Sequence, residues 1–153
     1  MPLMLMSPAF SPGGAIPSEY TCSGADISPP LAWSGVPAGT RSLVLVIEDP
    51  DAPSGTFRHW TAFDIPAGAH GFAAGYGPNR PVAGFRQTRN DFGGVGYGGP
   101  CPPPGPAHHY RFRLLAISRP SLDLPPSATA LDVLQAAQPY RIQQAELTGT
   151  YRR

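Results

Sequence analysis

The sequence predicts a mainly β domain with one or two peripheral helices. Its apolar residues gather in short runs rich in β-branched side chains, which are typical of strands. Proline and glycine supply 21 and 18 of the 153 residues and interrupt almost every window before residue 127, so helical signal is scarce there. Because 153 residues with 41% hydrophobic side chains suit one domain around one core, we expect a single domain spanning residues 1–153.

The clearest strand covers residues 42–49, which read Ser-Leu-Val-Leu-Val-Ile-Glu-Asp. A β-branched apolar run without alternation indicates a central strand that is buried on both faces. Residues 49–55 follow as Asp-Pro-Asp-Ala-Pro-Ser-Gly, and the two prolines and the glycine force a stiff loop. Two carboxylates, those of Asp49 and Asp51, are therefore expected at the carboxyl end of a central strand.

Two further strands are predicted over residues 59–65 and 109–117, and a histidine stands at the start of each. Side chains alternate across a strand, so Tyr110 and Phe112 share an apolar face, while His109 and Arg111 share the solvent-exposed face. The same parity places His108 on the Tyr110 side. We therefore expect His108 to point toward the core and His109 to point away from it.

The rest of the chain is less regular. Residues 66–107 read mostly as loop and include a stretch rich in glycine and proline over 93–105, and a structureless stretch of this size tends to be functional. Residues 127–137 predict a helix with Ser127 as N-cap and with Leu131 and Leu134 on one face. Residues 145–151 alternate apolar with polar side chains, which predicts a final half-buried strand.

Composition excludes several classes of protein. The net charge is +1, lysine is absent and no basic stripe occurs, which argues against a nucleic-acid partner. Neither a signal peptide nor an apolar run of membrane-spanning length is evident, so we expect a cytoplasmic protein with at most peripheral membrane contact.

The two cysteines, Cys22 and Cys101, are interpreted as free thiols in a reducing compartment. A disulfide between them is the alternative, and it requires their Cα atoms to lie within about 7 Å, which the sequence does not show.

Two segments carry candidate chemistry, and each is a rigid loop that leads into a strand opening with histidine. The first holds Asp49, Asp51 and His59, and the second holds His108 and Tyr110. If their strands are neighbours, these groups converge in one cleft, where imidazole and phenol groups can donate hydrogen bonds to a phosphate-like anion. Asp49 is expected beside His59, where it would favour the imidazolium.

Each residue also has a simpler interpretation. Aspartates in Asp-Pro-Asp commonly bond their own backbone in turns, and a strand-end histidine is commonly packed rather than functional. A metal site on Asp49, Asp51, His59 and His108 is a weaker alternative, because no dense ligand spacing is present. A hydrolase using His59 or His108 as general acid or base with Asp49 is another, although no Gly-x-Ser-x-Gly nucleophile motif occurs.

Taken together, both segments make the chain resemble the phosphatidylethanolamine-binding protein (PEBP) family, in its bacterial and archaeal, Raf-kinase-inhibitor-like branch. The matching stretches are Asp49-Pro-Asp-Ala-Pro with His59-Trp60, and Gly99-Pro-Cys-Pro-Pro with His108-His109-Tyr110. Stretches over residues 16–22, 26–33, 35–40, 87–92 and 145–151 also match, so the resemblance covers nearly the whole chain. The family pattern has Arg where His109 stands, a Gly-His-Ile-type stretch where 138–142 stand, and, in mammalian members, a C-terminal helical lid that is not expected here.

The resemblance implies a large central β-sheet packed on a smaller sheet with a few peripheral α-helices, and a pocket for phosphate-like anions, phosphoethanolamine-type head groups or phosphorylated side chains. It implies a cis bond at Ala52–Pro53, binding without catalysis, and neither cofactor nor metal. A kinase or protease that the chain would inhibit and a second copy of the chain are the implied protein partners. The pocket residues carried over are Asp49, Asp51, Pro53, His59, Gly99, Pro100, His108 and Tyr110, with Trp60 beside them.

Overall fold

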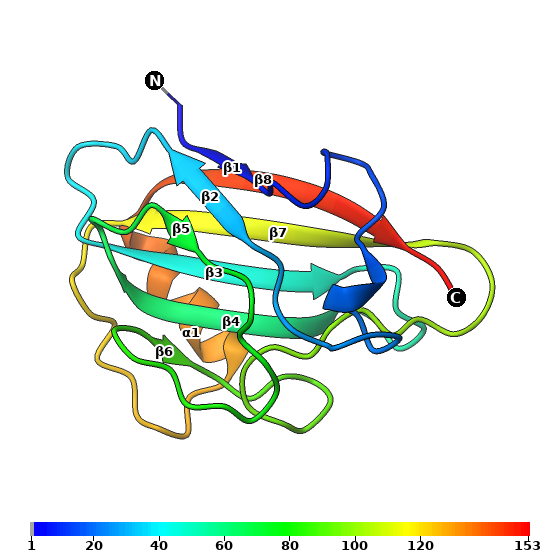
Figure 1. Ribbon diagram of the computed structural model, residues 1–153. Coiled ribbons are helices and arrows are strands. Elements are labelled where there is room, and N and C mark those ends of the chain that lie inside the picture. Colours follow the sequence, from blue (N-terminus) through cyan, green and yellow to red (C-terminus); the bar gives the residue numbers. More distant parts are fainter. Residues whose placement is uncertain (1) are drawn as a thin grey trace.

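The strands form two antiparallel sheets in the computed structural model, which describes residues 2–153, and the smaller sheet lies across one face of the larger (Figure 1). The larger sheet has the order β6-β4-β3-β7-β8, and the smaller has the order β1-β2-β5. The elements of the large sheet are β3 (Ser42–Asp49), β4 (Phe57–Pro66), β6 (Arg86–Gln87), β7 (His108–Ile117) and β8 (Arg141–Tyr151). Those of the small sheet are β1 (Met4–Met6), β2 (Leu31–Ser34) and β5 (Gly71–Phe72), and the helical elements are η1 (Ser18–Tyr20), α1 (Ala130–Ala137) and η2 (Gln138–Tyr140).

The strand β3 is central, as the apolar run predicts, and every one of its eight residues is buried. Its residues alternate between two apolar layers. Leu43, Leu45 and Ile47 face the core between the two sheets. Val44 and Val46 face a second, smaller core that Val133 and Ala137 of α1 cover (Figure 1). The mainly β fold with a large sheet packed on a smaller one is thus confirmed.

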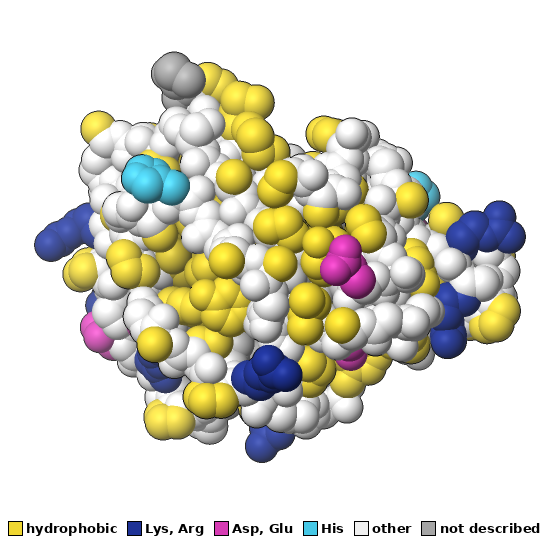
Figure 2. All heavy atoms as spheres, viewed as in Figure 1, with side chains coloured by type: hydrophobic (Ala, Val, Ile, Leu, Met, Phe, Trp, Pro, Cys, Tyr) yellow, Lys and Arg dark blue, Asp and Glu magenta, His cyan; other side chains and the backbone are white. Residues whose placement is uncertain are grey.

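Beyond the helix, the second face of the sheet carries charge instead of apolar packing. Glu48 is 1% exposed, and arginines from both neighbouring strands surround its carboxylate. The contacts are to Arg111 Nη2 at 2.7 Å, Arg113 Nε at 2.9 Å and Arg58 Nε at 3.7 Å. On the opposite face, seen in Figure 2, charged side chains of the described residues are scattered and form no continuous basic stripe.

The helix begins later than the sequence predicts. Thr129, not Ser127, is its N-cap, because the Thr129 hydroxyl accepts the Asp132 N–H while the Asp132 carboxylate accepts the Thr129 N–H. Its buried residues are Ala130, Val133 and Ala137, one stripe of an amphipathic helix, so Leu131 points to solvent. No helix among residues 2–153 is long and apolar enough to cross a membrane.

The interpretation of the cysteines as free thiols is wrong. Cys22 and Cys101 form a disulfide, with their Cα atoms 5.3 Å apart. Tertiary structure brings the two loops together, since the Cys22 N–H donates to the Pro100 carbonyl at 3.1 Å. Because the two cysteines are 79 residues apart in the sequence, no local pattern indicates that they lie close together.

The cis bond expected at Ala52–Pro53 is absent, as the described residues contain no cis peptide bond. The loop after β3 turns by other means. The Asp51 N–H donates to the Asp49 carboxylate at 2.8 Å, and the N–H of Gly55, whose φ is +106°, donates to the Ala52 carbonyl at 3.1 Å. Such an Asx turn followed by a left-handed glycine reverses the chain with trans bonds alone.

Candidate functional site

The candidate site lies where the last residue of β3 meets the first residues of β4 and β7. The strands are antiparallel, so the carboxyl end of β3 and the amino ends of its two neighbours share one edge of the sheet. A cavity of about 160 Å³ opens there. Its lining residues are Asp49, Ala52, Pro53, Phe57, His59, Phe92, Cys101, Pro102, Pro103, His108 and Tyr110.

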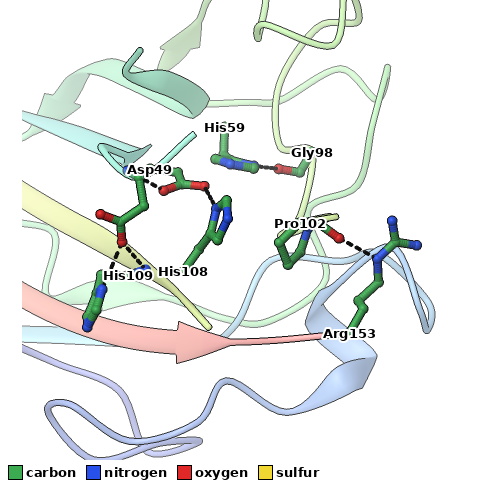
Figure 3. A network of polar contacts seen from close by, with 8 residues as sticks. Asp49, His59, Gly98, Pro102, His108, His109 and Arg153 are labelled. Atoms are coloured by element: carbon green, nitrogen blue, oxygen red, sulfur yellow. Dashed lines mark hydrogen bonds and ion pairs between the residues drawn. The ribbon is translucent and has the colours of Figure 1, made fainter. Parts of the chain in front are cut away.

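Two aspartate–histidine pairs join the end of β3 and the loop that follows it to the start of β7 (Figure 3). His108 Nδ1–H donates to Asp49 Oδ2 at 2.6 Å, inside the cavity wall. His109 donates to Asp51 Oδ2 through both its backbone N–H and its Nδ1–H, each at 2.8 Å, on the solvent side. The hydrogen bond from the His109 side chain, above all, lowers the pKa of Asp51. Strand parity therefore places His108 inward and His109 outward, as the sequence predicts.

The imidazole of His59 reaches the cavity because β4 is irregular at this point. Trp60 pairs with Ile47 and Arg58 pairs with Glu48, so His59 is left without a partner on β3. Such a bulge re-aims a side chain, and the His59 ring lies 5.3 Å from that of Tyr110. Its Nδ1–H donates to the Gly98 carbonyl at 2.7 Å, which leaves Nε2 as the nitrogen available to a ligand (Figure 3).

His59 is 3% exposed, and this burial lowers its pKa below the ordinary value of 6.5. Its hydrogen bond to the Gly98 carbonyl and the nearby charge of Asp49 oppose the shift without reversing it. The charge of Asp49 therefore favours the imidazolium of His59, as predicted, but the effect of burial is larger and the pKa stays below the ordinary value. The Asp49 carboxylate is bonded to His108 instead, and the buried ring of His59 is neutral at pH 7.

Tyr110 contributes a hydroxyl group that is fully buried, with 0% of the residue exposed, and that has no hydrogen-bond partner among residues 2–153. Burial, followed by the nearby charge of Asp49, raises its pKa, so the phenol keeps its proton at neutral pH. An unsatisfied buried hydroxyl costs about 1–3 kcal/mol. Tyr110 is also one of the residues that line the cavity.

Four of the residues expected in the pocket lie outside this cavity. Asp51 faces solvent with His109. Trp60 is 1% exposed in the core between the sheets, where its indole N–H donates to Gln87 Oε1 at 3.0 Å. Gly99 and Pro100 bond the segment around residues 22–26 through the Gly99 N–H and the Pro100 carbonyl. A Cβ on residue 99 would stand 2.4 Å from the Tyr20 carbonyl oxygen, so close backbone packing requires this glycine.

Sequence reasoning missed the aromatic rim of the cavity. The rings of Phe57 and Phe92 are 4.6 Å apart, and they lie 4.9 Å and 5.4 Å from the ring of His59. Phe57 stands two residues before His59, so strand alternation could have indicated it. Phe92 comes from a loop about 30 residues further along, and no local pattern points to it.

The cavity offers hydrogen-bond donors in apolar surroundings. Among residues 2–153 no cluster of three or more His, Cys, Asp or Glu side chains is suited to hold a metal ion. The lining also lacks a serine or threonine hydroxyl, and Cys101 is oxidised. A larger groove of about 360 Å³ between β6 and α1, lined by Arg58 and Arg89 among others, contains none of the expected pocket residues.

Comparison with known proteins agrees with this architecture. The family model described as phosphatidylethanolamine-binding protein matches residues 6–152. A UPF0098 protein of Methanothermobacter thermautotrophicus is 47% identical over 154 residues, covering 97% of this chain and 98% of the relative. One of Aquifex aeolicus is 46% identical over 150 residues, covering 97% and 88%.

Solved structures match along their whole length. YbcL of Escherichia coli, described as a new member of the mammalian PEBP family, superposes with a TM-score of 0.92 at 32% identity and covers 100% of this chain and 99% of its own. CT736 of Chlamydia trachomatis gives a TM-score of 0.90 at 36% identity, with 99% and 98% covered. The chain therefore belongs to the phosphatidylethanolamine-binding protein family.

Proposed function

We propose that the chain binds a phosphate-like anion in the cavity lined by Asp49, His59, His108 and Tyr110, and that it does so without chemical turnover. The single observation that carries this proposal is that Tyr110, whose buried hydroxyl has no hydrogen-bond partner among residues 2–153, lines the same cavity as two imidazoles. A phosphate oxygen would accept the hydrogen bond that Tyr110 otherwise lacks. A volume of about 160 Å³ suits a head group and is smaller than pockets for drug-sized ligands, which begin at about 300 Å³.

Replacing Tyr110 by Phe tests this role directly. The affinity for inorganic phosphate should fall about tenfold or more, because a hydrogen bond to a charged group is lost. The melting temperature should stay the same or rise, because the hydroxyl has no hydrogen-bond partner in the described part of the chain. Titration calorimetry and thermal unfolding measure the two quantities.

The control for this substitution is Tyr140→Phe, which removes a phenol hydroxyl outside the cavity and should leave phosphate affinity unchanged. Equal phosphate affinity in wild type and Tyr110→Phe would refute the site assignment.

Methyl phosphate, a phosphotyrosine peptide and vesicles with phosphoethanolamine head groups share the recognised chemistry. A preference for the peptide would favour a kinase- or protease-regulating role, and a preference for vesicles would favour a lipid role.

Anion affinity should also depend on pH through His59. Its pKa lies below 6.5 in the free protein, and a bound anion would raise it by favouring the imidazolium. Affinity is therefore greatest below the pKa of the free protein and falls as pH rises toward the pKa of the complex, and between these two pKa values binding takes up a proton. Sulfate suits the measurement because its charge is constant between pH 5 and 8, whereas phosphate and its monoesters change charge within this range.

The control is His59→Asn, whose amide keeps a donor for the Gly98 carbonyl but cannot be protonated. Calorimetry in buffers of different ionisation enthalpy should detect proton uptake in wild type and less in the variant. Sulfate affinity that stays constant from pH 5 to pH 8 in the wild type would contradict this mechanism.

Hydrolysis is the second candidate, and the Asp49–His108 hydrogen bond favours it, because a carboxylate on Nδ1 orients an imidazole as a general base. Against it, the cavity lining offers no free hydroxyl or thiol nucleophile apart from the Tyr110 phenol, which burial keeps protonated. Turnover of a phosphoester panel that is lost in Asp49→Asn would establish hydrolysis in place of simple binding.

A further inference from the structure

One wall of the anion cavity is a proline segment, residues 100–104, that offers almost no backbone donors. Cys101, Pro102 and Pro103 of this segment line the cavity. Four of its five residues are prolines, so Cys101 has the only backbone N–H. The segment therefore depends on its carbonyl groups, on side-chain packing and on the disulfide to Cys22 for its position.

The hydrogen bonds of the proline segment are accepted by its carbonyl groups. The Pro100 carbonyl accepts the Cys22 N–H at 3.1 Å, and the Pro102 carbonyl accepts Arg153 Nε at 2.6 Å (Figure 3). The first of these bonds joins the same two loops as the disulfide, so opening the disulfide leaves this junction to a single hydrogen bond of the Cys22 backbone. The reduced proline segment would fluctuate more than the oxidised one.

The hydrogen-bond donors of the cavity are anchored independently of the disulfide. His59 lies on β4 and is bonded twice to Gly98, since its carbonyl accepts the Gly98 N–H at 3.0 Å and its ring donates to the Gly98 carbonyl at 2.7 Å. Tyr110 lies within β7, paired with Gly149 of β8. Opening the disulfide would therefore loosen one wall of the cavity without displacing His59 or Tyr110.

The disulfide is also placed where a small thiol can approach it. Cys22 and Cys101 are both half-buried rather than fully buried, and both line a hollow of about 330 Å³. Cys101 lines the anion cavity as well, so the hollow and the cavity adjoin at the disulfide. Thiol–disulfide exchange requires that a thiolate reach one of the two sulfur atoms, and a partly exposed bridge allows this approach.

We propose that the Cys22–Cys101 disulfide is a redox switch of the anion cavity: the oxidised chain binds the anion tightly, and reduction by a dithiol weakens binding. One thiolate of the reductant attacks a bridge sulfur, the S–S bond breaks, and the other cysteine leaves as a thiolate. The second thiolate of the reductant then displaces the first cysteine and closes an intramolecular disulfide. Two electrons thus pass from the dithiol to the bridge, and both cysteine thiolates take up protons from water. This inference rests on the proposed function.

A loosened wall lowers affinity because the anion must order it on binding. Ordering the backbone of a single residue corresponds to a loss of about fivefold or more in affinity. The coupling is reciprocal, so a bound anion must make the disulfide harder to reduce by the same factor.

The first test titrates sulfate by calorimetry into the oxidised chain and into the chain held in excess dithiothreitol. Both measurements are made well below the melting temperature, with circular dichroism to verify that the reduced chain is folded. Sulfate affinity of the reduced chain should be about fivefold or more lower. The double variant Cys22→Ser, Cys101→Ser should bind sulfate like the reduced wild type, whether or not dithiothreitol is present.

The second test measures the same coupling at the disulfide. The chain is equilibrated with mixtures of reduced and oxidised dithiothreitol, and its free cysteines are alkylated and counted by mass. The ratio of reduced to oxidised dithiothreitol that opens half of the bridges should rise about fivefold or more in saturating sulfate. Sodium chloride at equal ionic strength is the salt control and should not change this ratio.

Val133→Ala is the control for a general loss of stability. Val133 is fully buried beneath α1 on the opposite face of the large sheet, so its truncation destabilises the chain without changing the cavity lining. Sulfate affinity of this variant should equal that of wild type. A decrease as large as that of the reduced chain would overturn the switch, because affinity would then follow stability alone.

The remaining outcomes separate this inference from the proposed function. Equal sulfate affinity in the oxidised and reduced chains would overturn the switch and leave the anion cavity standing. A reduced chain that is unfolded in the first test would also overturn it, because the bridge would then support the whole fold rather than one wall. No binding of sulfate or phosphate to the oxidised chain would overturn the proposed function together with this inference.

Discussion

Replacing Glu48 by Gln is expected to lower the free energy of unfolding by about 3 kcal/mol. The carboxylate is 1% exposed and lies within 4.0 Å of the guanidinium groups of Arg58, Arg111 and Arg113. Gln preserves the shape but leaves three positive charges on one sheet face without their shared counter-charge. This decrease in the free energy of unfolding is at the low end of the range for breaking a buried ion pair, because the arginines stay partly exposed to water.

Thermal and denaturant unfolding measure this effect, which corresponds to a decrease in melting temperature of about 6–12 °C for a chain of this size. The control is Asp123→Asn, which breaks the Arg119–Asp123 pair at 2.8 Å. Asp123 is 74% exposed, so the expected loss there is under about 1 kcal/mol. Similar small losses for both variants would mean that the Glu48 cluster is as weak as a surface ion pair.

Removal of the disulfide is expected to have a comparable or larger effect. The bridge joins residues 79 positions apart, and closing a loop of that length in the unfolded chain accounts for about 4 kcal/mol. The double variant Cys22→Ser, Cys101→Ser should therefore melt about 8–16 °C below wild type. Serine retains nearly the same size, so the packing of the two loops changes little.

A reducing agent supplies the control for this prediction. It should lower the melting temperature of the wild type toward that of the double variant and leave the double variant unchanged. If reduction has no effect on the wild type, the bridge does not contribute to stability. Alkylation of free thiols at the moment of cell lysis would reveal whether the disulfide forms in the cell, which bears on the predicted cytoplasmic location.

Local sequence patterns predicted the elements that build the site. The unbroken apolar run of 42–49 matches β3 residue for residue, because burial on both faces leaves no other pattern possible. Strand alternation also placed His108 inward and His109 outward. The helix start was missed by two positions, since Ser127 and Thr129 are both acceptable caps and only the bond between Thr129 and Asp132 distinguishes them.

The partners of the charged groups could not be predicted. Asp49 bonds His108 and not His59, because a bulge that depends on the pairing of β4 with β3 turns His59 toward the Gly98 carbonyl. The disulfide and the Phe92 rim depend on how long loops cross one another, and the sequence contains no periodic signal for that.

What the sequence determined by itself is therefore the β-rich class, the central strand and the identity of the groups at its carboxyl end, since hydrophobic periodicity and turn residues act over a few positions. Only the tertiary structure decided which of those groups share a cavity, and that the Tyr110 hydroxyl is buried without a hydrogen-bond partner among residues 2–153. Hydrogen-bond partners and desolvation arise from contacts between segments far apart in the chain, so they exist only once the sheets have packed.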